Sequence, residues 1–195
     1  MMQMNALEIV GVCSGIAGVW LTAQKNIWCF PIGLINVMIT TWLVYEAKLF
    51  ADVLQQIMFA SLLVIGWIKW HKQTSEVIIA KIKNATEVIL YVIMFIAIAS
   101  ALYVILVSYT QAAYPLWDSI GTALSFVAQW MIAKRKIENW LIWIPVNVIY
   151  SILFFMKDLP LYSTLSIVYL LMAVVGYFNW KKILQKQNTN GLAWS

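Results

Sequence analysis

Seven long apolar segments, separated by short polar or charged breaks, constrain this chain more than any other feature of its sequence. They cover approximately residues 5–23, 28–46, 50–69, 86–108, 114–133, 139–156 and 160–180. A helix that crosses a bilayer needs about 20 mostly apolar residues, so seven such helices leave little of the 195 residues for a soluble domain. Only 11% of the residues are charged, against about 25% in soluble domains, which excludes a water-soluble globule. We expect an all-α integral membrane protein with seven transmembrane helices.

The positively charged residues predict how these helices are oriented. Eleven of the 13 Lys and Arg residues fall in alternate connections on one side, and Lys48 and Lys157 fall on the other. Because Lys and Arg in short loops are retained in the cytoplasm, we expect the N-terminus outside and the C-terminus in the cytoplasm. The net charge of +5 therefore reflects topology. No basic helix stands apart from the apolar segments, so a nucleic-acid partner is not expected.

The two ends of the chain resemble each other when one is shifted so that Gly11 falls on Gly121. The same shift pairs Trp20 with Trp130, Gly66 with Gly176, Trp70 with Trp180 and, with one inserted residue, Asn36 with Asn147. A single transmembrane transporter domain, 1–195, would thus hold two three-helix repeats, 5–70 and 114–180, joined by a linker helix at 86–108. Three crossings leave the chain on the opposite side of the membrane. The linker helix adds a fourth crossing, so both repeats have the same orientation. This predicts the 3+1+3 parallel repeat of the SWEET-like fold, with substrate between the two bundles.

Catalytic and metal-binding residues are not apparent in the sequence. The acidic residues mostly flank helix ends, and neither Cys13 nor Cys29 has a His or an acid at ligand spacing. We therefore expect neither an enzyme, nor a metal site, nor a cofactor. Asp118 lies closest to an interior position, and an ionisable group at membrane depth suggests function. A structural role, bonding a neighbouring helix or capping its own, is favoured for it.

Aromatic and amide residues give the strongest functional signal. Trp140, Trp143, Asn147 and Tyr150 follow the spacing i, i+3, i+7 and i+10, which places them on one helix face. A carboxamide within a span must face protein or an aqueous cavity. We expect these residues to form a pocket wall that stacks on flat rings and attracts a ring-centred cation.

The first repeat contributes a similar set of residues to this predicted cavity. They are Trp28, Pro31, Asn36, Thr40 and Thr41. Together the two repeats predict a cavity that is polar but uncharged.

In these features the chain resembles the PnuC family of bacterial vitamin transporters, whose typical member carries nicotinamide riboside. The most specific element is W-x-x-W-x-x-x-N/D, present here as Trp140-Leu-Ile-Trp143-Ile-Pro-Val-Asn147. The flanking residues that also fit are Asp118, Thr122, Lys136, Glu138, Asn26-Ile27-Trp28, Gly66 and Trp70. The resemblance extends from the first helix to Trp180.

The resemblance implies a SWEET-like fold, frequently a homotrimer, in the bacterial inner membrane. It also implies facilitated diffusion of an unphosphorylated vitamin. Since the spans hold no acid at mid-depth, we expect a uniporter. Net uptake would then be drawn by a cytoplasmic riboside kinase, which is the expected functional partner.

The expected substrate, nicotinamide riboside, suggests which residues contact each of its parts. The two indoles suit a pyridinium ring, Asn147 suits an amide or hydroxyl group, and Thr122, Ser125 and Gln129 could meet a sugar. For Gln129, near the inner end of its helix, snorkelling toward the interface is favoured. A phosphate would find no Lys or Arg in the core, so the mononucleotide should be excluded.

Three alternatives remain at this point. Relatives with the same fold carry thiamine or riboflavin, and thiamine is also a flat cation. A membrane-embedded enzyme would need a catalytic constellation, and a purely structural subunit would lack a polar midplane.

Overall fold

The computed structural model describes residues 6–46, 50–72 and 78–189, and these form seven α-helices. The helices are α1 (Ala6–Ala23), α2 (Cys29–Glu46), α3 (Phe50–His71), α4 (Ala85–Tyr109), α5 (Pro115–Ala133), α6 (Asn139–Met156) and α7 (Pro160–Thr189). Each coincides closely with one of the seven apolar segments, except that α7 continues well beyond residue 180. Lys48, part of the predicted outer charge, and the tail after Thr189 lie outside the described residues.

Proline and left-handed turn residues set several helix boundaries. Pro115 and Pro160 are the first residues of α5 and α7, where the missing N–H removes no intrahelical hydrogen bond. The chain leaves α1 and α5 through Lys25 (φ 61°) and Arg135 (φ 58°). Both conformations lie in the left-handed region that ends helices, so the two helices end in similar tight turns.

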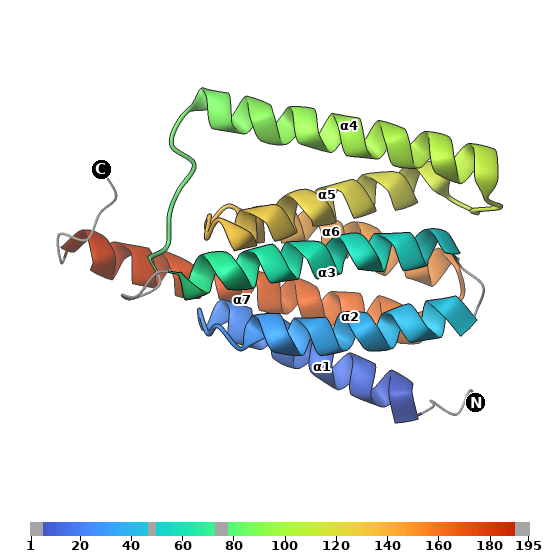
Figure 1. Cartoon of the computed structure of the whole chain (residues 1–195), viewed down its shortest axis with the longest axis horizontal. Helices are drawn as coiled ribbons and strands as arrows, with labels where there is room; N and C mark the ends of the chain where they lie inside the picture. The colour runs from blue at the N-terminus through green and yellow to red at the C-terminus, as the bar shows by residue number, and fades with distance from the viewer. Residues whose placement is uncertain (1–5, 47–49, 73–77, 190–195) are drawn as a thin grey trace.

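Six helices form one bundle, and α4 lies along its outside (Figure 1). Within each half of the bundle, helices that follow one another in the chain pack together: α1 with α2, α2 with α3, α5 with α6, and α6 with α7. The halves are joined by contacts of α1 with α7 and of α3 with α5. Among the described helices, α4 packs against α5 alone.

The helix boundaries of the first half recur in the second half in the register that pairs Gly11 with Gly121. Helices α2 and α6 each contain 18 residues, and they begin and end at paired positions. The ends of α1 and α5 are also paired, and so are the starts of α3 and α7. This register needs no inserted residue, so the insertion expected from the sequence is wrong. Asn36 corresponds to Val146, and Asn147 lies one position further along its helix.

Buried aromatic rings hold the two halves together. We call four of them, each at most 2% exposed and linked by ring contacts, the aromatic layer: Phe30, Trp70, Trp140 and Trp180. The Trp70 Nε1–H donates to the Ile132 carbonyl across 3.1 Å, and the Trp180 Nε1–H donates to the Thr22 carbonyl across 3.0 Å. The register that pairs Gly11 with Gly121 also pairs the two donors with each other and the two acceptors with each other. The halves are thus joined by two corresponding hydrogen bonds, made in opposite directions.

Of the seven described helices, six are long and apolar enough to cross a membrane, and α5 is the exception. Its polar side chains Ser119, Thr122, Ser125 and Gln129 are all buried. Since α5 packs against α3, α4 and α6, other helices cover these groups and lipid does not. A helix enclosed in this way does not need an apolar surface to lie within a bilayer.

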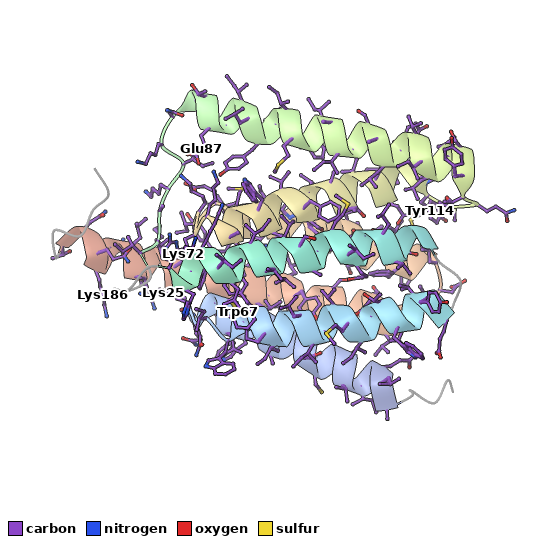
Figure 2. All side chains as sticks on the ribbon, in the orientation of Figure 1. Lys25, Trp67, Lys72, Glu87, Tyr114 and Lys186 are labelled. Atoms are coloured by element: carbon purple, nitrogen blue, oxygen red, sulfur yellow. The ribbon has the colours of Figure 1, made fainter. Side chains whose placement is uncertain are left out.

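The labelled cations gather at one end of the bundle. Lys25, Lys72 and Lys186 lie at the end where α1 and α5 finish, and Tyr114 lies at the opposite end (Figure 2). We call the end with these three lysines the basic end. It is the end that the distribution of charge in the sequence predicts to be cytoplasmic.

Candidate functional site

A cavity of about 280 Å³ lies between the two halves of the bundle. Its walls come from α1, α2, α3, α5, α6 and α7. On α2, α5 and α6 the lining residues belong to the half of the helix nearer the basic end. Among the described residues, no Asp, Glu, Lys, Arg or His lines this cavity. We call it the central cavity.

One face of α6 forms a wall of the central cavity, as the sequence predicts. Trp140, Trp143 and Asn147 all line it. Tyr150, about one turn further along, does not. The predicted wall is therefore present over its first two turns only.

Trp140 combines close packing with an unused hydrogen-bond donor. Its ring is 2% exposed and meets the Trp180 ring edge to face, with centroids 5.6 Å apart. Within the described part of the chain, the buried Trp140 Nε1–H has no acceptor. An unsatisfied buried donor costs about 1–3 kcal/mol, so a bound molecule that supplied an acceptor would gain affinity.

Two asparagine amides are held by donating to the protein itself. The Asn147 Nδ2 group donates to the Trp143 carbonyl across 2.7 Å. The Asn36 Nδ2 group donates to the Gly11 carbonyl across 2.6 Å and to Ser14 Oγ across 3.3 Å. Since both side chains line the central cavity, each Oδ1 remains as an acceptor for a ligand.

Several lining residues are missing from the set that the sequence predicts, and two of them carry large polar side chains. Gln56 of α3 and Tyr169 of α7 both line the central cavity. A Cβ at Gly15 would collide with the Tyr169 hydroxyl group and lie 3.2 Å from Asn36 Nδ2, so this glycine makes room for both groups. Gln56 carries the same signal as Asn147, a carboxamide within an apolar span. Tyr169 carries none, because tyrosine is unremarkable in a membrane helix.

A second polar group lies outside the central cavity, between α5 and α6. The Thr122 and Tyr150 hydroxyl groups are 3.1 Å apart, and Ser125 Oγ donates to the Gly121 carbonyl across 2.8 Å. The structure does not bring these residues together with the indoles. By contrast, Gln129 is 8% exposed and lines the cavity, so the expected snorkelling is wrong.

Asp118 lies away from the central cavity in the first turn of α5. Its two carboxylate oxygens accept from Lys157 Nζ across 2.9 and 3.0 Å. This ion pair joins the start of α5 to the end of α6. It corresponds to the structural role, a bond to a neighbouring helix, that the sequence favours.

Of the five residues expected from the first repeat, only Asn36 lines the described cavity. Trp28 is 63% exposed, and the residue that corresponds to Trp140 is Phe30. Thr40 and Thr41 donate to carbonyls of their own helix across 2.9 and 2.7 Å. Trp28, Pro31 and the two threonines are absent from the cavity wall that the structure describes, so their expected place in it is wrong.

Part of the aromatic layer lies at the end of the central cavity nearer the basic end. Phe30 and Trp140 of the aromatic layer line its wall. Beside them packs Ile79, which is fully buried and precedes α4.

The family model described as nicotinamide mononucleotide transporter matches residues 5–182. The chain belongs to this family, PnuC. Two PnuC relatives, both described as nicotinamide riboside transporters, are 26% identical to it. The Escherichia coli protein matches over 98% of this chain and 91% of its own length. The Neisseria mucosa protein matches over 93% of this chain and 74% of its own length.

A solved PnuC structure has the same arrangement of helices. The crystal structure described as that of the vitamin B3 transporter PnuC superposes with a TM-score of 0.76 at 25% identity. The match covers 92% of this chain and 82% of that one. The chain is therefore a multi-pass membrane transporter of the PnuC family and not an enzyme.

Proposed function

We propose that this protein carries nicotinamide riboside across the bacterial inner membrane by facilitated diffusion, through the central cavity. The observation that carries this proposal is a cavity lined by two indoles and several amides but by no charged residue of the described chain. The E. coli and N. mucosa relatives are described as transporters of the same molecule.

The indoles account for the ring of this substrate. Nicotinamide riboside carries a positive charge on a flat pyridinium ring. The face of an indole is negative and attracts such a cation, by about 2 kcal/mol or more once water is excluded. Trp143 lines the cavity one turn from Trp140, so the ring can stack on an indole without an acidic partner.

The hydrogen-bonding groups account for the rest of the molecule. The carboxamide and ribose hydroxyl groups are donors, and the Oδ1 atoms of Asn36 and Asn147 are acceptors on the cavity wall. The carboxamide oxygen is an acceptor, and Trp140 Nε1 is a buried donor without a partner in the described chain. Trp140 and Asn147 are about 10 Å apart along the helix, so an elongated ligand can contact both.

The absence of charge in the cavity wall argues against a phosphorylated substrate. A phosphate group in the cavity would leave water without a Lys or Arg of the described lining to pair with it. Burying an unpaired charge costs several kcal/mol. The riboside is therefore the substrate and the mononucleotide, which the family description names, is not.

Transport without ion coupling follows from the same composition. A symporter usually holds its proton or Na⁺ on an intramembrane acid or on a cage of carbonyl groups. Asp118 is paired with Lys157 and lies outside the cavity. A carrier of this kind only equalises the electrochemical potential of its substrate, so a cytoplasmic riboside kinase draws net uptake.

The architecture we propose is a 3+1+3 parallel repeat of SWEET type within a single domain, 1–195. The constant register between the two halves and the peripheral position of α4 support it. The cations at the basic end favour a cytoplasmic location for that end. A homotrimer, implied by the family resemblance, completes this proposal.

Competition for binding tests the choice of substrate against thiamine and riboflavin. The purified protein in detergent is titrated with nicotinamide riboside, thiamine and riboflavin by calorimetry. We expect the riboside to bind and the other two to displace it at much higher concentrations, because neither offers a pyridinium carboxamide. Tighter binding of thiamine or riboflavin would assign the chain to another vitamin.

The energetics are tested separately in proteoliposomes clamped at zero voltage. The clamp is needed because the membrane potential alone biases a cation by about 2.3 kcal/mol per 100 mV. Labelled riboside should then accumulate to the external concentration and stop. If an imposed proton or Na⁺ gradient drove it higher, and Asp118→Asn abolished the excess, transport would be coupled through Asp118.

A further inference from the structure

A second pocket lies at the basic end, where α3 finishes and α4 begins. It has a volume of about 710 Å³ and shares no lining residue with the central cavity among those described. We call it the basic pocket. Six cationic side chains of the described chain line it: Lys69, Lys72, Lys83, Lys134, Arg135 and Lys136.

The single acid among the described lining residues is already engaged. Glu87 accepts from Lys136 Nζ across 2.8 Å, and Lys136 Nζ also donates to the Lys81 carbonyl across 2.8 Å. Glu87 further accepts from the Lys83 backbone N–H across 2.9 Å. This carboxylate therefore balances one cation of the six, and the pocket keeps a strong positive charge.

Two of the remaining cations lie against the same aromatic ring. Lys69 Nζ lies 4.2 Å from the centroid of the Trp130 ring, and Lys134 Nζ lies 5.3 Å from the same centroid. Positive charge is therefore concentrated beside this ring, and a bound anion would reduce the repulsion among the cations.

Arg135 supplies an independent indication of a missing partner. Its Nη1 atom is buried, and no acceptor for it exists in the described part of the chain. A guanidinium group matches the geometry of phosphate oxygens, and hydrogen bonds to such an anion are among the strong ones in proteins. A buried donor beside a cationic pocket is what a bound phosphate group would satisfy.

The walls of the pocket are fixed by backbone pairing. The Ala80 N–H donates to the Arg135 carbonyl, and the Ile137 N–H donates to the Ala80 carbonyl, each across 3.0 Å. This short parallel bridge ties the segment before α4 to the turn between α5 and α6. Leu90 of α4 and Ile78 add an apolar side, so the pocket is a built recess and not a loose patch of surface lysines.

We propose that the basic pocket binds a phosphate-bearing anion, with Arg135 as its principal donor. Two sources supply this chemistry at a cytoplasmic membrane face: the headgroup of an anionic lipid, and a soluble phosphate compound. Basic pockets between transmembrane helices on this side can hold lipid headgroups. The proposal does not depend on which molecule the central cavity carries.

The test compares two variants of the purified full-length protein. Arg135→Gln removes the proposed donor, and Lys25→Gln is its control. Lys25 has a matching backbone angle, φ 61° against 58°, and a place in the same turn of the other half, but it is outside the basic pocket. Each variant therefore loses one charge at a similar backbone position.

Thermal unfolding is followed in two arms. One arm adds phosphatidylglycerol to the detergent micelles, with phosphatidylcholine as reference. The other adds inorganic phosphate or pyrophosphate, with sodium chloride at equal ionic strength as reference. We expect one arm to raise the unfolding temperature of the wild type and Lys25→Gln, and Arg135→Gln to need about tenfold more ligand. The arm that responds identifies the source.

Two outcomes would overturn the proposal. One is the absence of stabilisation of the wild type in both arms. The other is an equal response of the two variants, which would indicate general attraction to a basic surface. If Arg135→Gln does not fold, the exposed Lys134 on the same turn replaces it as Lys134→Gln, with the same control and the same two criteria.

Discussion

Trp140 and Trp180 carry the same side chain but use their indole N–H groups differently. Trp180 donates to the Thr22 carbonyl across 3.0 Å, whereas Trp140 has no acceptor in the described chain and lines the central cavity. The first bond holds the fold together. The second donor is the one that we propose a ligand would use. The same substitution at the two positions should therefore affect mainly ligand binding at one and mainly stability at the other.

Replacement by phenylalanine removes each donor and keeps an aromatic ring. For Trp140→Phe we expect about tenfold weaker riboside binding, from the loss of one buried hydrogen bond, and a smaller drop in unfolding temperature than for Trp180→Phe, since both lose ring packing. For Trp180→Phe we expect a lower unfolding temperature, because the Thr22 carbonyl loses its donor. Calorimetric titration and thermal unfolding measure the two effects. If both variants responded alike in both measurements, the two indole N–H groups would not have different roles.

Stacking on Trp143 can be tested in the same binding assay. Stacking of a base on an aromatic side chain is worth about 1–3 kcal/mol by alanine substitution, so Trp143→Ala should weaken riboside binding about tenfold or more. Trp42→Ala is the control, because Trp42 is 54% exposed and outside the cavity. Equal affinities of the two variants would mean that Trp143 is scaffold. Trp70→Ala, at a fully buried position, should instead lower the yield of folded protein.

At this scale the sequence predicts residues on one helix well and contacts between helices poorly. The spacing of Trp140, Trp143 and Asn147 places them on one face, and all three line the central cavity. The sequence puts Gln129 at the interface, because hydropathy does not reveal which helices enclose α5. The partner of Asp118 is Lys157, 39 residues away, and no local pattern indicates such a pair.

At the scale of helices, close packing of α6 and α7 depends on a glycine. A Cβ at Gly176 would lie 2.7 Å from atoms of the buried Trp140 ring. Gly176→Ala should therefore destabilise the protein by about 1–3 kcal/mol through overpacking. At Gly18 a Cβ would meet no atom closer than 3.8 Å, and alanine favours a helix by about 1 kcal/mol. Gly18→Ala should be neutral or stabilising.

Chemical denaturation of the two alanine variants in the same detergent checks this difference. If Gly176→Ala were as stable as Gly18→Ala, the contact between α7 and the Trp140 ring would be looser than the structure indicates.

The helices themselves can be predicted almost completely, because hydropathy and the breaks in it determine spans directly. Hydropathy does not reveal that α5 is enclosed by other helices. Its polar residues are covered by α3, α4 and α6. Matching Asn36 with Asn147 puts the register of the repeat off by one position. Both asparagines line the central cavity, although they occupy neighbouring positions of related helices. Two residues can therefore line the same cavity without occupying equivalent positions in the two halves.

For the whole molecule, the orientation of the bundle gives a simple prediction. A reporter that is active only in the periplasm, fused after Ser195, should stay silent, because the cations of the basic end retain that end in the cytoplasm. The same reporter fused before Met1 should be active, because this orientation places the N-terminus in the periplasm. Activity at the C-terminus would reverse the topology, and with it the cytoplasmic placement of the basic pocket.

The account as a whole depends on an uncharged cavity that accepts the riboside and rejects its phosphate ester. The most direct test measures uptake of labelled nicotinamide riboside and of labelled nicotinamide mononucleotide into proteoliposomes that contain only this protein, at zero voltage. We predict rapid uptake of the riboside to the external concentration, with the mononucleotide no faster than in liposomes without protein. Equal uptake of both compounds, or uptake of the mononucleotide alone, would contradict the account.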